Sequence, residues 1–127
     1  MMQTYFAQLQ AVVDQYAATD FVLETNLNFE TRPASQAYLA GTITLSDNSA
    51  LHFSEFLDQM GDEVEKLMYT YHYQDADNHL IFRYDNARHK PPLASSEHKH
   101  LPNQVTEAAS PTLDDVLAEI FTMKGWV

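Results

Sequence analysis

Two alternating stretches joined by a run of turn formers constrain the fold of this chain more than any other feature. Every second residue of 69–73 is aromatic, and in 80–85 the same period places Leu80, Phe82 and Tyr84 on one face, opposite Ile81, Arg83 and Asp85. The run Asp75-Ala76-Asp77-Asn78 lies between them and favours a tight turn, so the segment predicts a β-hairpin. Paired strands place same-face residues opposite one another. The register that keeps the aromatic residues together therefore puts His72, Arg83 and Asp85 on the other face.

The same period-two pattern predicts three more strands upstream of this hairpin. The predicted strands cover residues 21–32, 37–46, 50–58, 64–73 and 80–85. Gly41 in the second strand marks either a bulge or a close packing contact. His52 in the third strand stands alone and is interpreted as structural.

Amphipathic helices are predicted at both ends of the chain. Apolar residues at helical spacing indicate one helix over residues 4–18. The other helix follows a polar linker, with Ser110 as N-cap, Pro111 in the first turn and Gly125 as its stop. The order of helix, five strands and helix predicts an α+β fold as a single domain over residues 1–127. About five antiparallel strands would form a meander, packed by the N-terminal and the C-terminal helix.

Composition limits the classes of function. The 127 residues include no cysteine, which excludes a disulfide framework and a thiolate zinc site. No signal pattern or apolar run of membrane length is present, so we expect a cytoplasmic protein with no membrane partner. The net charge of −11 argues against general affinity for nucleic acid. Residues 83–100 nevertheless carry +2, from four of the seven Lys and Arg and two acids, which leaves −13 on the remainder. This distribution suits either a ligand held at a few phosphates or a solvated basic loop.

The hairpin and the residues after it collect side chains suited to acid–base chemistry, and three interpretations remain open. The first is cleavage of phosphodiesters without metal, because histidine exchanges protons near neutral pH and arginine and lysine bind phosphate oxygens. In the second, His98 and His100 with His89 and Asp85 hold zinc or another divalent ion, which the basic neighbours oppose. In the third, Arg83 and Asp85 form an ion pair and the histidines are surface residues. We predict no metal and no cofactor.

The ordered strings YTYHYQDADNHLIFRYDNARHKPPL and HKHLP, with GTITLSDNSALHFSEF upstream, resemble the TumE-like toxin family. The resemblance covers roughly residues 39–102 and the last helix. It implies a toxin of a toxin–antitoxin pair, encoded beside its antitoxin, that acts as a ribonuclease and is inhibited by that cognate antitoxin. Lys90 and Glu97 stand where members often have further histidines.

Together the residues and the resemblance predict a metal-independent endoribonuclease. The catalytic candidates are His72, Arg83, Asp85, His98 and His100. The candidates for binding the RNA substrate are Tyr71, Tyr84, Arg88, His89 and Lys99. His72 and one of the two later histidines would act as base and acid, Arg83 and Lys99 would bind the scissile phosphate, and Asp85 would orient a neighbour. The alternative is a non-enzymatic protein whose cationic His-rich loop binds a partner protein or a phosphate ligand. Whether aromatic surface serves a homodimer is left open by the sequence.

Overall fold

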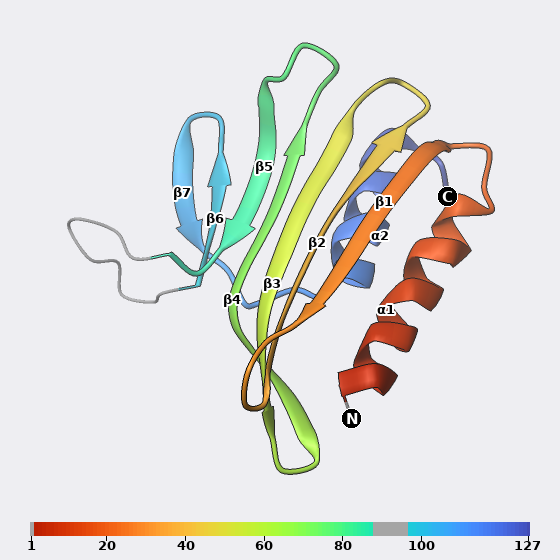
Figure 1. The fold of residues 1–127 in the computed structure, drawn as a ribbon. Helices are drawn as coiled ribbons and strands as arrows, with labels where there is room; N and C mark the ends of the chain where they lie inside the picture. Colours follow the sequence, from red (N-terminus) through yellow and green to blue (C-terminus); the bar gives the residue numbers. More distant parts are fainter. Residues whose placement is uncertain (1, 88–96) are drawn as a thin grey trace.

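The computed structural model describes residues 2–87 and 97–127, which form a sheet covered on one face by two helices (Figure 1). The sheet has seven antiparallel strands whose spatial order is their order in the chain, so it is a meander. The elements are α1 (Met2–Ala17), β1 (Val22–Thr31), β2 (Gln36–Leu45), β3 (Ala50–Met60), β4 (Glu63–Gln74), β5 (Leu80–Asp85), β6 (His98–Leu101), β7 (Gln104–Glu107) and α2 (Leu113–Lys124). The predicted α+β class, the meander and the two terminal helices are confirmed. Neither helix is long and apolar enough to cross a membrane.

The sheet is wider than predicted because β6 and β7 come from residues interpreted as a loop and a linker. Both strands have four residues, and Leu101 pairs with Gln104 across a short turn. All four residues of β7 are exposed. No apolar alternation therefore marks β7 in the sequence, although β6 pairs with β5 and extends the sheet.

Asparagine closes two of the hairpins. Asn48 has φ 65° and Asn78 has φ 66°, in the left-handed region that asparagine tolerates better than most residues. The Leu45 N–H donates to the Ser49 carbonyl, and the Asp75 N–H donates to the His79 carbonyl, each at 2.9 Å. Both are three-residue loops with a left-handed final residue, as is common in hairpins. This local chemistry explains why the predicted turns fall at these positions.

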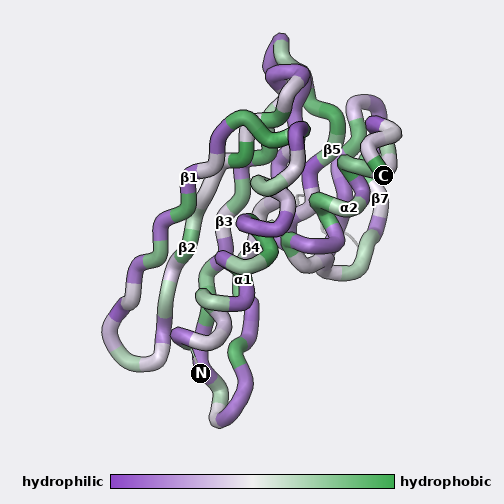
Figure 2. Tube along the Cα trace, turned by 90° about the vertical axis from the view of Figure 1, so that its right-hand side faces the viewer, coloured by the Kyte–Doolittle hydropathy of each residue, from purple (hydrophilic) through white to green (hydrophobic). Residues whose placement is uncertain are grey.

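Alternation along the strands builds the core between sheet and helices, and Figure 2 shows hydrophilic and hydrophobic residues following one another along the strand traces. Buried side chains of the sheet include Leu39, Ile43, Leu51, Tyr71 and Phe82, and those of α2 include Val116, Leu117 and Ile120. Gly41 faces this side, where a Cβ atom would lie 2.6 Å from the Asn26 carbonyl oxygen and from the Phe53 ring. The register runs through Gly41 without a shift, so the glycine marks a close contact and not a bulge.

The start of α2 differs from the prediction by two residues. Thr112, and not Ser110, is the N-cap, and its hydroxyl accepts a hydrogen bond from the Asp115 N–H. The Asp115 carboxylate accepts from the Thr112 N–H at 2.9 Å, which completes a capping box. Pro111 precedes the cap and does not lie in the first turn. The predicted stop is confirmed, because Gly125 has φ 71° and caps the C-terminus.

An acidic side chain, Glu55, lies within the core. Glu55 is 1% exposed and accepts hydrogen bonds from the hydroxyls of Tyr5 on α1 and Tyr71 on β4. The Lys66 amine donates to the Tyr71 hydroxyl at 2.7 Å. Burial lowers the pKa of Lys66, although nearby carboxylates, Glu55 foremost, act in the opposite direction. The Glu55 side chain is therefore satisfied by donors from a helix and a strand, as a buried polar group requires.

Candidate active site

The face of the sheet opposite the helices, called the open face below, collects the predicted catalytic residues. Register places four of its side chains in one row across four strands: His52 pairs with His72, His72 with Arg83, and Arg83 with His100. We call His52, His72, Arg83 and His100 the cationic row. Asp85 and His98 are paired in the next row of the same face. The predicted parity, with the aromatic residues on one face and His72, Arg83 and Asp85 on the other, is confirmed.

Hydrogen bonds indicate which ring nitrogen of His72 carries the proton. An Arg83 guanidinium nitrogen, Nη1, lies 3.4 Å from His72 Nδ1, and His72 Nε2 lies 3.1 Å from Gln74 Oε1. Since guanidinium can only donate, Nδ1 is the acceptor, and Nε2 then carries the proton that it donates to Gln74. Burial lowers the pKa of His72, and the positive charge of Arg83 lowers it further. His72 is therefore held neutral, as a general base must be.

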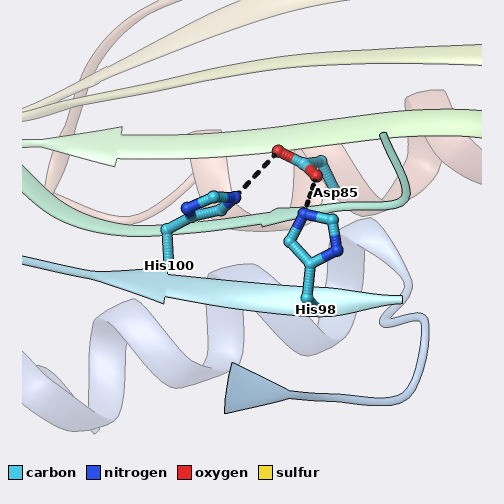
Figure 3. Close-up of side chains that lie close together, drawn as sticks. All are labelled: Asp85, His98 and His100. Atoms are coloured by element: carbon cyan, nitrogen blue, oxygen red, sulfur yellow. Dashed lines mark ion pairs between the residues drawn. The ribbon is translucent and has the colours of Figure 1, made fainter. Parts of the chain in front are cut away.

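Asp85 joins three basic side chains, Arg83, His98 and His100, and Figure 3 shows its contacts with the two histidines. Its Oδ1 contacts Nε2 of His98, and its Oδ2 lies 2.8 Å from Arg83 Nε and 3.5 Å from His100 Nε2. Asp85 and His98 are both buried, with side-chain exposures of 5% and 0%. Burial alone would raise the pKa of Asp85, but Arg83, the Ala87 N–H and His98 outweigh it and the pKa lies below its ordinary value. The carboxylate is thus a fixed negative charge that orients Arg83 and both histidines.

A hollow of about 460 Å³ lies beside the cationic row. Small residues, Ala40, Gly41 and Ser54, line it together with aromatic and basic ones. The lining residues are Tyr38, Ala40, Gly41, His52, Phe53, Ser54, Thr70, His72 and Arg83. A second hollow of about 390 Å³ adjoins it and shares Tyr38, Ser54 and Thr70. The two hollows together form a groove along the open face, within the usual size range of ligand sites.

Three of the predicted substrate-binding residues lie on the opposite, helix-covered face. Tyr71 is 0% exposed and is engaged by Glu55. The Tyr84 hydroxyl donates to Glu119 on α2 at 2.6 Å, and Lys99 forms an ion pair with the same carboxylate at 2.7 Å. The structure therefore does not bring these three residues to the cationic row. Arg88 and His89, also predicted to bind substrate, lie outside the described residues.

His52 and Tyr38 border the site without having been predicted. Nδ1 of His52 lies 3.0 Å from the Thr42 hydroxyl, and its ring centroid is 6.4 Å from that of His72. The alternation of β3 already indicates that His52 lies on the open face, since Leu51 and Phe53 flank it and point into the core. The alternation of β2 likewise places Tyr38 on the open face, but the hollow beside it depends on how β2 pairs with β3 and β3 with β4, which the sequence does not show.

The donor set of Asp85, His98 and His100 could in principle hold a metal ion, because one ligand atom from each lies within 4.8 Å of the others. One carboxylate and two imidazoles suit a divalent transition metal. The guanidinium of Arg83 already occupies Oδ2 at 2.8 Å, however, and would lie against the cation. Asp85, His98 and His100 therefore fit a hydrogen-bonded network around a carboxylate better than a metal centre.

Fold and site define a two-layer α+β protein whose sheet carries histidine, arginine and aspartate on the face opposite its two helices. The model of the family described as Toxin TumE matches residues 9–124, nearly the whole chain. The chain therefore belongs to the TumE toxin family, the toxins of toxin–antitoxin systems, which implies a cognate antitoxin as partner. A search of curated proteins and a search of solved structures found no match.

Proposed function

We propose that this toxin is an endoribonuclease that cleaves RNA without a metal ion and is inhibited by its cognate antitoxin. The observation that carries the proposal is the cationic row beside the hollow, with Asp85 fixing its geometry. Neighbouring strands are about 4.8 Å apart, so His72 on β4 and His100 on β6 lie about 10 Å apart with Arg83 between them. A phosphate bound at Arg83 would have one imidazole on each side.

The chemistry follows from this arrangement. Neutral His72 takes the proton from the 2′-hydroxyl, whose oxygen attacks phosphorus, and Arg83 stabilises the added negative charge. The bond from phosphorus to the 5′-oxygen breaks, and protonated His100 gives its proton to that oxygen. The carboxylate of Asp85, 3.5 Å from His100 Nε2, stabilises the positive charge that His100 carries before the transfer. The products are a 2′,3′-cyclic phosphate and a 5′-hydroxyl.

The roles of the remaining candidates change with their position. His98 is completely buried against Asp85, so we assign it to positioning and give the acid role to His100. Lys99 lies with Glu119 on the other face, which leaves Arg83 to bind the scissile phosphate. Nδ1 of His72 becomes available as a base when Arg83 turns from it towards the phosphate.

The test is RNA cleavage in EDTA by the parent and by His72→Gln, His100→Gln and Arg83→Gln. Each variant should lose about 10²- to 10⁴-fold in rate. His79→Gln is the matched control, because His79 is exposed at the tip of the β4–β5 hairpin and pairs with Asp75. A deoxyribose at the scissile position should abolish cleavage. Variants as active as the parent would refute the site assignment.

A metal hydrolase is the second candidate, and the grouping of Asp85, His98 and His100 favours it. It predicts bound metal after gentle purification and loss of cleavage in EDTA. A non-enzymatic binding protein, in contrast, would show no cleavage under either condition and no growth arrest when expressed without its antitoxin.

A further inference from the structure

We infer that the open face carries a base-stacking subsite at Tyr38, so that the substrate is single-stranded RNA with an unpaired base held beside the cationic row. The inference rests on the proposed function and specifies its substrate. Its evidence is a second row of side chains, separate from the catalytic candidates.

This second row is apolar although it lies on the open face. Tyr38 pairs with Phe56, and Phe56 pairs with Met68, so the three side chains lie side by side on β2, β3 and β4. Met68 is 61% exposed. The guanidinium of Arg32 lies over the Tyr38 ring, 5.5 Å from its centroid. An aromatic ring with a cation at its face and apolar neighbours is a surface on which a planar base can stack.

The spacing links this apolar row to the cationic row. Phe56 and His52 are four residues apart on β3, which corresponds to about 13 Å along the strand. Between the two rows stand the small side chains Ala40, Ser54 and Thr70, of which Ser54 and Thr70 line both hollows and Ala40 lines the first. Tyr38 lines both hollows. A short extended strand of RNA with a phosphate at Arg83 can thus reach the Tyr38 ring with a neighbouring base.

Charge shows why stacking must contribute to affinity. Among the described residues, the lysine or arginine side chains on the open face are Arg32, which pairs with Glu30, and Arg83, which pairs with Asp85. Lys66, Lys99 and Lys124 lie elsewhere. The whole chain has a net charge of −11. The two phosphate contacts that these described arginines can make supply little affinity on such a protein. Stacking on a ring requires a base that is not already stacked within a duplex, which selects single strands.

Binding tests the inference separately from cleavage. A labelled, unstructured 12-mer with 2′-O-methyl riboses cannot be cut by the proposed chemistry, and fluorescence anisotropy measures its affinity for the full chain. Tyr38→Leu should bind about 5- to 150-fold more weakly than the parent, whereas Tyr38→Phe should stay within about twofold. Trp126→Leu, an aromatic loss away from the open face, should leave the affinity unchanged. The same sequence as a duplex should bind the parent more weakly.

A second measurement requires no variant. Single abasic sites moved along the 12-mer should lower the affinity of the parent about 5- to 150-fold at one or two positions and little elsewhere.

The outcomes separate the two proposals. If Arg83→Gln weakens binding but Tyr38→Leu and the abasic sites do not, the subsite is wrong and the ribonuclease stands. If Tyr38 governs binding but RNA is never cleaved, the ribonuclease proposal is wrong and the subsite stands. A duplex bound as tightly as the single strand overturns the subsite. So does a Tyr38→Leu variant that loses capture of the antitoxin while keeping its affinity for the 12-mer.

Discussion

Replacement of Asp85 by asparagine should destabilise the fold measurably, because this carboxylate organises the end of the sheet where β5 meets β6. The substitution keeps the size of the side chain but removes its charge and one of its two acceptor oxygens. The remaining oxygen can serve His98 or Arg83, but not both. The loss can therefore be worked out contact by contact.

The contact with His98 weighs most. His98 is 0% exposed and faces Oδ1, and a hydrogen bond to a charged group in such a place contributes about 1.5–3 kcal/mol. Arg83 is 39% exposed, so its ion pair at 2.8 Å is screened by water and contributes about 0.5 kcal/mol. His100 lies at 3.5 Å, beyond good hydrogen-bond distance, and adds little. We expect Asp85→Asn to cost about 2 kcal/mol in the free energy of unfolding.

Urea denaturation at pH 7 measures this cost. With a slope of about 2 kcal/mol per molar urea, the midpoint should fall by about 1 M. Asp62→Asn makes the same change of charge in an exposed turn, and its midpoint should move by less than about 0.25 M.

The difference between parent and Asp85→Asn should also depend on pH. The pKa of Asp85 is lowered in the folded state, so its stabilisation is present above the unfolded value of about 3.9 and is lost as pH falls through the lower folded value. The difference in unfolding free energy between the parent and Asp85→Asn should therefore become smaller in acid. An unchanged midpoint at pH 7, or a difference that does not become smaller in acid, would refute the view that Asp85 is a buried, charged organiser.

Three further predictions concern other parts of the molecule. The NMR titration of His72 should give a pKa below the ordinary value, and Arg83→Gln should raise that pKa, because the guanidinium charge is, after burial, the largest cause that lowers it. The absence of an upward change would contradict the assigned hydrogen bond. Gly41→Ala should lower the urea midpoint more than Gly61→Ala does. A Cβ atom at Gly41 would lie 2.6 Å from a backbone oxygen and from a ring, whereas at Gly61 no atom lies within 4 Å of the added Cβ and only the φ of 62° opposes alanine. Equal losses would show that the contact at Gly41 relaxes freely. Thr112→Ala should cost about 1 kcal/mol in thermal or urea unfolding through loss of the N-cap, whereas Ser110→Ala should cost little; the reverse order would restore Ser110 as the cap.

Local patterns in the sequence predicted the parts of the fold that depend on local chemistry. Alternation predicted which residues of β4 and β5 share a face, and hence that His72, Arg83 and Asp85 lie on the same face of the sheet. The same alternation already put Tyr71 and Tyr84 on the aromatic face, in conflict with the substrate-binding roles that family resemblance implied for them. In the structure both are engaged by carboxylates on the helix side. Periodicity therefore predicted which of these side chains share a face of the sheet.

Features that depend on pairing between distant segments could not be predicted. The strand β7 has no buried residue, so only its partner β6 reveals it. The alternation of β3 puts Glu55 on the core face, but the hydroxyls that donate to it come from distant segments, Tyr5 on α1 and Tyr71 on β4. The groove beside Tyr38 likewise exists because β2, β3 and β4 align their small residues.

Strand register explains how residues from four strands reach one row. The β3–β4 pairing shifts between Phe56 and Leu57, and the β4–β5 pairing shifts between Tyr73 and Gln74. Both shifts fall outside the pairs of His52 with His72 and His72 with Arg83, so these pairs remain in continuous register. A slip of one residue in either ladder would turn one member of the row towards the helices. Because the helix-covered face is packed with large buried side chains, such a slip would also place polar groups in the core, and the packing that stabilises the fold therefore also maintains the alignment of the candidate site.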